Sequence, residues 1–202
     1  GKTTLKEMTR SILERVGPTL ATAGNLNNDI GMPLMLTRLD VTHRYAVIEM
    51  GANHAGEIDY LTRIARPDVA VLNNAGRAHL EGFGDLDGVA HAKGELFACL
   101  DSGGTAVINA DDRYAGLWRE LAGYSRVMDF GLSGAAAVTA DWQGDAAGSD
   151  VKLRTPAGEL AIRLALPGRH NVMNALAATA AAIALRARWF WMASGNSIVI
   201  VP

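Results

Sequence analysis

The sequence predicts an α/β fold: a doubly wound, mostly parallel sheet of P-loop type with a small antiparallel β meander. Three observations lead to this prediction. Short apolar segments alternate with helix-like segments along residues 2–130, which is typical of a parallel sheet covered on both faces. Polar clusters follow the apolar segments, where such sheets bind ligands. Finally, Gly1-Lys2-Thr3-Thr4 opens an amphipathic segment, as the back half of a phosphate-binding loop does.

The helices are predicted from apolar residues that recur at three- and four-residue spacing. In the first helix Leu5, Met8 and Ile12 fall on one side, and in the second Pro33 is tolerated because it lies in the first turn. The expected helices cover residues 2–16, 30–39, 56–66, 86–100, 112–122 and 172–187.

The strands are predicted from short apolar runs, and the helices between them require parallel pairing. The expected parallel strands cover residues 19–23, 45–50, 69–73, 105–109 and 126–130. Turns rich in glycine and aspartate then join residues 138–142, 150–155 and 159–166, which predicts the antiparallel meander.

Four polar segments follow predicted strands, namely residues 25–29, 49–54, 73–84 and 109–112. Because the carboxyl ends of parallel strands meet at one edge of a sheet, we expect these segments to form one ligand site.

Composition narrows the function classes. Of the 202 residues 49% are apolar, enough for one sizeable core or one core with a small subdomain. The 19 basic and 21 acidic residues give no basic excess, so no nucleic-acid partner is expected. The lone cysteine, Cys99, excludes an internal disulfide and fits a reducing cytoplasm. The longest apolar run, residues 175–185, is too short for membrane insertion.

Glu49 is a candidate metal ligand. It ends an apolar run just before Gly51, and burying a carboxylate is costly unless it is paired or meets a metal. If Lys2 contacts phosphate and Thr3 a metal, phosphoryl transfer needs such further ligands for Mg²⁺. The alternative is a strand-end carboxylate in water or in a salt bridge.

Two histidines and one lysine are weaker candidates from the residue pattern alone. His79 follows the strand 69–73 in an expected loop, and His54 lies between glycines that let the backbone approach a ligand. Each is equally an ordinary loop histidine. Lys93 lies inside the helix 86–100 and is either solvated or desolvated, lowered in pKa and open to modification.

The end of the chain differs from the rest. We expect residues 1–187 to form a nucleotide-binding domain that lacks its first strand and half of the P-loop, and 188–202 to be an atypical tail without an assigned role. The tail carries Trp189, Phe190 and Trp191 and a strand-like run at 198–201. An interface, a core plug and a reading-frame artefact remain open for it.

Several motifs in order resemble the central, ATP-binding domain of the Mur ligase family. They are residues 1–8, 24–31, 48–54, 73–74, 78–83, 92–95, 109–112 and 167–171. The resemblance covers residues 1–187 and implies an ATP-dependent amide ligase. The implied member joins D-alanyl-D-alanine to UDP-N-acetylmuramoyl-tripeptide through an acyl phosphate during peptidoglycan precursor synthesis.

The resemblance implies roles for individual residues. The implied ATP-binding residues are Gly1, Lys2, Thr3, Thr4, His170, Asn171 and Asn174. The implied Mg²⁺ ligands are Thr3, Glu49, His79 and Lys93, with Lys93 matching a lysine that is carbamylated in the family. Lys2, Lys93 and His79 would be catalytic. The implied substrate-binding residues are Asn27, Asn28, Asp29 and His54.

The sequence also departs from the family pattern. The domains that the family places before and after the central one are absent from these residues, so we expect little or no ligase activity from this stretch alone. Another Mur or folylpolyglutamate-type ligase, a non-catalytic nucleotide-binding module and an unstable fragment remain alternatives. The family resemblance implies a cytoplasmic enzyme.

Overall fold

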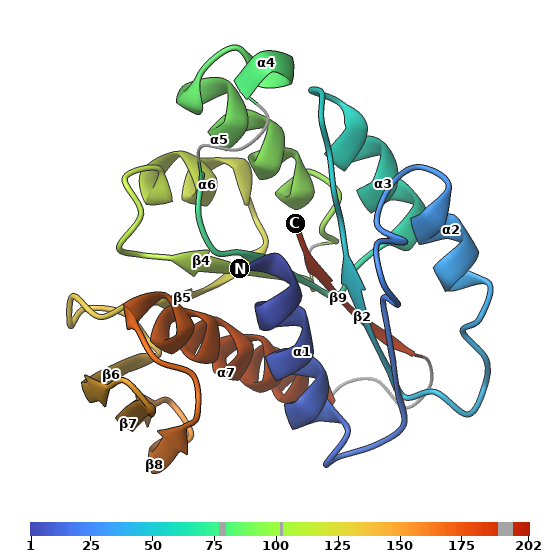
Figure 1. The fold of residues 1–202 in the computed structure, drawn as a ribbon. Helices are drawn as coiled ribbons and strands as arrows, with labels where there is room; N and C mark the ends of the chain where they lie inside the picture. Colours follow the sequence, from blue (N-terminus) through green and yellow to red (C-terminus); the bar gives the residue numbers. More distant parts are fainter. Residues whose placement is uncertain (77–79, 102, 190–195) are drawn as a thin grey trace.

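The computed structural model describes residues 1–76, 80–101, 103–189 and 196–202. Its main element is a six-stranded parallel sheet in the order β1-β2-β9-β3-β4-β5, and a smaller antiparallel sheet has the order β6-β7-β8 (Figure 1). The strands of the main sheet are β1 (Thr19–Ala21), β2 (Tyr45–Glu49), β3 (Val69–Leu72), β4 (Thr105–Asn109), β5 (Arg126–Phe130) and β9 (Ser197–Val201). The predicted fold class is therefore confirmed.

Helices cover both faces of the main sheet (Figure 1). On one face lie α1 (Lys2–Leu13) and α7 (Arg169–Trp189), which pack against each other. On the other face lie α2 (Gly31–Leu36), α3 (Glu57–Ala65), α5 (Leu86–Gly94) and α6 (Ala115–Leu121). No helix in the described part of the chain is both long and apolar enough to cross a membrane.

The two cores follow from the period of two along each strand. In β2, Val47 joins the core beneath α1 and α7, whereas the next residue, Ile48, joins the core on the opposite face. Val199 and Ile200 divide in the same way in β9. Both faces of the central strands are thus dry, as expected for a parallel sheet.

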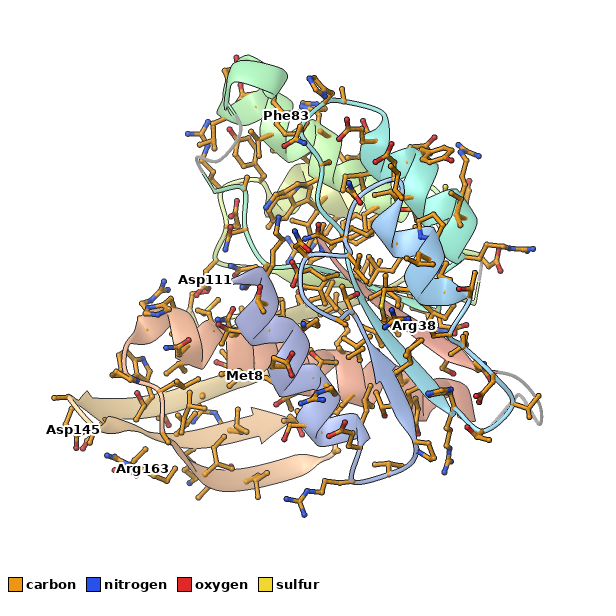
Figure 2. The ribbon with its side chains drawn as sticks, turned by 45° about the vertical axis from the view of Figure 1, so that its right-hand side comes forward. Met8, Arg38, Phe83, Asp111, Asp145 and Arg163 are labelled. Atoms are coloured by element: carbon orange, nitrogen blue, oxygen red, sulfur yellow. The ribbon has the colours of Figure 1, made fainter. Side chains whose placement is uncertain are left out.

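The small sheet consists of β6 (Thr139–Asp145), β7 (Gly148–Thr155) and β8 (Gly158–Leu164). One face packs on α7 through Val151 and Leu153. The solvent side carries ion pairs, among them the one between Asp145 and Arg163, which lie together in Figure 2. The small sheet therefore covers α7 on the side that faces away from the main sheet (Figure 1).

Several predicted element boundaries were wrong for local reasons. The helix expected over residues 86–100 becomes 3₁₀ at η1 (Glu95–Phe97), directly after Gly94. The helix expected from residue 112 begins at Ala115, because the Asp112 side chain accepts a hydrogen bond from the Tyr114 amide. The first helix ends at Leu13 and the last begins at Arg169.

The loop expected over residues 73–84 contains a short helix, α4 (Leu80–Phe83). A Cβ at Gly82 would lie 1.8 Å from the Asn53 carbonyl oxygen, so only glycine permits this approach. Contact with the loop after β2 thus fixes α4 in place. The spacing of apolar residues in the sequence does not reveal such a contact.

The C-terminal residues are part of the main sheet. Helix α7 continues past residue 187 to Trp189, and β9 lies between β2 and β3. Residues 190–195, which include Phe190 and Trp191, lie outside the described residues. The expected boundary at 187 therefore marks the end of the family resemblance and does not separate two structural units.

Asp111 ties three elements together at the carboxyl edge. Its carboxylate accepts hydrogen bonds from the Leu132 amide at 2.8 Å and from the amide and hydroxyl of Ser133, and it pairs with Arg169 at 3.1 Å. Burial opposes ionisation of Asp111, but the hydrogen bonds and the Arg169 charge outweigh it and lower its pKa. Asp111 thus fixes the start of α7 to the ends of β4 and β5.

Among the described residues Trp118 is the largest fully buried side chain, and its indole N–H donates to the Ala90 carbonyl at 3.0 Å. We expect Trp118→Ala to lower the free energy of unfolding by about 3–5 kcal/mol through the cavity it leaves. Trp118→Phe should cost only about 1–2 kcal/mol, since it keeps most of the ring and loses the hydrogen bond. Urea denaturation measures both, and equal losses would show that α6 is not anchored by this packing.

Because the pKa of Asp111 is lower in the folded chain than in the unfolded one, its contribution to stability is present above the unfolded pKa, about 4. It is lost as the pH falls through the folded pKa. Urea midpoints of wild type and Asp111→Asn should therefore differ most near pH 7 and converge below about pH 4. A difference that grows on acidification would contradict this role.

Candidate functional site

A cavity of about 190 Å³ lies where α1 begins, at the carboxyl edge of the main sheet. Its polar wall consists of Gly1, Lys2, Asn73, Asn74 and Lys93. Its apolar wall includes Leu5, Met50, Ile58, Phe83, Val89, Val201 and Pro202. The first turn of a helix and two lysines therefore face one enclosed space, an arrangement suited to phosphate.

The loop after β3, residues 73–76, forms one side of this cavity and is held by four hydrogen bonds. The backbone carbonyl of Asn73 accepts a hydrogen bond from the Asn109 side chain at 2.8 Å. The side-chain amide of Asn73 donates to the side-chain oxygen of Asn174 at 2.7 Å. The Asn74 carbonyl accepts from Lys93 at 2.8 Å. The Ala75 amide donates to Asp112 at 3.2 Å. These bonds come from β4, α5, α7 and the loop after β4.

Lys93 lies near the end of α5, with its amine on the Asn74 carbonyl. Burial and then the positive charge of Lys2 lower its pKa to about 8, while Asp112 acts in the opposite direction. A substantial fraction of this amine is neutral near physiological pH, so burial and the Lys2 charge favour the desolvated alternative over the solvated one.

Glu49 is buried at the end of β2, with 4% of its surface exposed. One carboxylate oxygen accepts from the Asn27 side chain at 2.9 Å, and the other, Oε2, is buried with no hydrogen-bond partner among the described residues. Its amide donates to Thr22 at 2.9 Å, and the Thr22 carbonyl accepts from Lys6 of α1 at 2.7 Å. A cation bound to Oε2 would compensate its desolvation.

The start of α7 lies beside Gly1. A Cβ on Gly1 would be 3.5 Å from the Asn174 carbonyl oxygen, Oδ1, which already accepts from Asn73. The Asn171 side chain donates to the Pro167 carbonyl at 2.8 Å, whereas His170 is exposed. Asn174 thus lies behind two residues of the cavity wall, Gly1 and Asn73, whereas His170 lies on the surface.

A second cavity of about 400 Å³ is lined in part by the loop after β2. Asn28 and Asp29 line it together with Gly51 and Tyr60. The other two predicted substrate residues are placed differently. The Asn27 side chain donates its hydrogen bond to Glu49. His54 is largely exposed, and its Nδ1 lies 3.0 Å from the Glu57 carboxylate.

Glu95 joins the two sides of the site. Its carboxylate accepts from the Gly56 amide at 2.8 Å and from the Asp59 amide at 3.1 Å, and so caps α3 from 39 residues away. Gly56 itself has φ of +86° and no side chain with which to cap the helix. Because Glu95 follows Lys93 closely, it couples the Lys93 segment to the loop after β2.

The structure thus brings Lys2 and Lys93 together in one cavity. Glu49 directly precedes Met50, which also lines that cavity. Thr3 and Thr4 lie in the first turn of α1, and Thr3 is exposed. His79 lies outside the described residues. Within the described ranges, no three His, Cys, Asp or Glu side chains are grouped as a metal site.

Sequence reasoning missed Glu95, Asp112 and the residues Val201 and Pro202 of the cavity wall. Glu95 and Asp112 stood in recognised motifs, but their role depends on distant backbone amides. The strand-like run at the end of the chain was visible, and its apolar β-branched residues are typical of a central strand.

The model of the Mur ligase middle domain matches residues 1–182. The UDP-N-acetylmuramoyl-tripeptide–D-alanyl-D-alanine ligase of Escherichia coli is 47% identical over 93% of this chain and 42% of that protein. The enzyme of the same name from Haemophilus influenzae is 46% identical over 91% of this chain and 40% of its own length. The chain therefore spans about two fifths of these relatives.

Solved structures agree with this similarity. A crystal structure of MurF from Acinetobacter baumannii has a TM-score of 0.89 and 45% identity, over 92% of this chain and 41% of that one. MurF ligase from Thermotoga maritima, solved in complex with ADP, has a TM-score of 0.81 and 28% identity, over 92% and 43% of the two chains. The chain belongs to the Mur ligase family, and residues 1–182 correspond to its middle domain.

Proposed function

We propose that this chain is the ATP-binding part of an amide ligase that joins D-alanyl-D-alanine to UDP-N-acetylmuramoyl-tripeptide. The observation that carries the proposal is the cavity that Lys2 and Lys93 share at the start of α1. The names of the similar ligases supply the reaction, and the ADP complex of the Thermotoga maritima relative supports the nucleotide.

The cavity suits the phosphate end of a nucleotide. The first backbone amides of α1 have no partner within the helix, and the helix dipole favours an anion there. In this assignment Gly1, Lys2, Thr3 and Thr4 bind the phosphates, with Lys2 on the β- and γ-phosphates. The adenine would lie outside the cavity, against the start of α7, where His170, Asn171 and Asn174 are placed.

The residues present fit Mg²⁺, because Glu49 offers a buried carboxylate oxygen without another partner in the described structure. Mg²⁺ prefers one or two carboxylates together with phosphate oxygens and waters. We assign Glu49 and the Thr3 hydroxyl to the metal, with His79 and a carbamate on Lys93 as further ligands. The ion would neutralise the charge that develops on the transferred phosphoryl group.

Lys93 is suited to carbamylation because its amine is partly neutral near pH 8. The ammonium first loses a proton. The neutral amine nitrogen then forms a bond to the carbon of CO₂ and loses a second proton, so that a carbamate anion takes the place of the cation. That change converts the repulsion between Lys93 and Lys2 into attraction.

The chemistry needs an activated acyl group, since a carboxylate is a poor acyl donor. A carboxylate oxygen of the tripeptide attacks the γ-phosphorus of ATP, and the bond to the β-phosphate oxygen breaks and releases ADP. The amine of D-alanyl-D-alanine then attacks the acyl carbon, expels phosphate and loses a proton. Lys2 and the first amides of α1 hold the phosphates in line for the first step.

The remaining parts of the reaction are assigned to other domains of the same enzyme, which grip the uridine nucleotide and the acceptor dipeptide. Asn28 and Asp29, in the second cavity, face the muramoyl substrate in this assignment, with His54 at the rim and Asn27 acting through Glu49. We assign the enzyme to the cytoplasm, in keeping with its use of ATP and a UDP-linked precursor, and we expect neither nucleic-acid nor membrane partners.

Titration calorimetry with ADP, with and without Mg²⁺, tests the phosphate and metal assignments. Lys2→Ala should weaken ADP binding about tenfold or more in both conditions, because it removes a charge-assisted contact. Glu49→Gln should abolish only the gain from Mg²⁺. Lys152→Ala, on the exposed face of β7, is the matched control and should change neither. Unchanged binding in Lys2→Ala would refute the phosphate site.

The Lys93 amine should titrate near pH 8 in a metal-free sample without added CO₂. Nitrogen-detected NMR of labelled lysine side chains measures this pKa directly. Lys2→Ala should raise the pKa of Lys93 because it removes a like charge, and Asp112→Asn should lower it. A value near 10.4, the ordinary lysine pKa, would contradict the desolvated site.

A further inference from the structure

Lys6 is a buried lysine that the reaction proposed above does not use. It lies on the inner side of α1 with Thr9 and Leu13, and only 3% of its surface is exposed. Its amine donates to the Thr22 carbonyl at 2.7 Å and pairs with Glu7 at 2.9 Å. A buried ammonium is costly unless it is paired, and an apolar side chain of similar size can occupy such a position without that cost. Lys6 is therefore a candidate for a role beyond packing.

The ion pair with Glu7 does not account for the burial of Lys6. The Glu7 side chain is about half exposed and also pairs with Arg10 at 2.9 Å. The same ion pair would form equally well at the surface, where such pairs contribute little to stability. The bond that holds the amine inside is the one to Thr22, a buried residue.

This bond changes the hydrogen bonding where β1 and β2 part. The strands pair in parallel up to Ala21, which lies opposite Val47, and the Thr22 amide still donates to the Val47 carbonyl at 3.0 Å. In a regular parallel ladder the next bond would join the Glu49 amide to the Thr22 carbonyl. Here that carbonyl accepts from Lys6, and the Glu49 amide donates to the Thr22 hydroxyl at 2.9 Å instead. The Thr22 side chain thus takes the place of its own carbonyl in the ladder.

The chain leaves the sheet at this point. The Thr22 carbonyl is turned toward α1, and the loop of residues 23–30 begins. This loop returns over the end of β2, where the Asn27 carbonyl accepts from the Gly51 amide at 2.7 Å. The Asn27 side chain donates to the Glu49 carboxylate at 2.9 Å. The orientation of that carboxylate therefore depends on a loop whose start is anchored to α1.

We propose that Lys6 is a positioning residue for the carboxylate assigned to Mg²⁺. By holding the Thr22 carbonyl away from the Glu49 amide, it fixes the path of the Asn27 loop. That loop holds one oxygen of Glu49 and leaves the other available to the ion. Lys6 itself touches neither phosphate nor metal in this assignment. Because α1 also carries Lys2, one turn earlier, the same bond keeps the phosphate and metal groups at a fixed separation. The inference rests on the magnesium assignment of the proposed function.

The hydrogen-bond pattern is tested first, without nucleotide or metal. Scalar couplings across hydrogen bonds, measured by NMR on the isotope-labelled protein, report which carbonyl accepts from each amide. The wild type should show a coupling from the Thr22 amide to the Val47 carbonyl, and none from the Glu49 amide to the Thr22 carbonyl. In Lys6→Met the second coupling should appear, because the released carbonyl returns to the ladder.

Thr9→Ala is the matched control for this measurement. It removes another buried hydrogen bond of α1, from the Thr9 hydroxyl to the Leu5 carbonyl at 2.9 Å, and should keep the wild-type pattern of couplings. A coupling from the Glu49 amide to the Thr22 carbonyl in the wild type would overturn the inference. Its absence from folded Lys6→Met would do the same.

Calorimetry with ADP, with and without Mg²⁺, tests the consequence for the metal. Lys6→Met should bind ADP alone within about twofold of the wild type, since the groups assigned to phosphate are unchanged. Its gain from Mg²⁺ should fall about tenfold, because the Glu49 carboxylate is no longer held in place. A role in folding alone would lower the urea midpoint without changing this gain, as we expect for Thr9→Ala.

Thr22 supplies a second pair of variants, so that the test does not depend on the folding of Lys6→Met. Thr22→Val keeps the shape but has no hydroxyl for the Glu49 amide, and it should also lose the gain from Mg²⁺. Thr22→Ser keeps the hydroxyl and should retain the gain. A wild-type gain that persists in Lys6→Met, or in Thr22→Val if Lys6→Met does not fold, overturns the inference but leaves the proposed function standing. No gain in the wild type overturns the magnesium assignment and the inference with it.

Discussion

The fixed loop after β3 is the constraint on which the rest of the site depends. Residues 73–76 have no regular structure of their own, yet side chains of Asn109, Asp112, Lys93 and Asn174 hold them by hydrogen bonds. Asn109, Asp112 and Lys93 come from segments at one edge of the sheet. Asn174 comes from α7. The cavity between this loop and α1 exists because its walls are tied to four separate elements.

The site contains two unfavourable electrostatic features, a pair of like charges and an unpaired buried carboxylate oxygen, which a magnesium nucleotide would compensate. Lys2 and Lys93 face one cavity and repel each other, while Glu49 keeps a buried oxygen unpaired within the described structure. Anions between the lysines and a cation at Glu49 would compensate both groups. Preorganised charges of this kind lower the cost of reorganisation during reaction, at some expense of stability in the free protein.

The sequence predicted the parts of the structure that depend on local pattern. Strands β4 and β5 were placed at their observed bounds because short runs with apolar residues stand out between helices. What could not be predicted depends on distant partners. Glu95 caps a helix 39 residues away, Gly82 packs on the Asn53 backbone, and β9 enters the sheet between two strands far earlier in the chain. Periodicity carries no information on such pairings.

The most direct test of the account is a map of where phosphate binds. Amide chemical shifts of the labelled protein, followed during titration with magnesium pyrophosphate, report on every backbone position around the site. If phosphate binds in the first cavity, the largest changes should fall on the first turn of α1, the amides of residues 73–76 and the end of β9. Changes confined to the second cavity, around Asn28 and Tyr60, would show that phosphate does not bind where the helix begins.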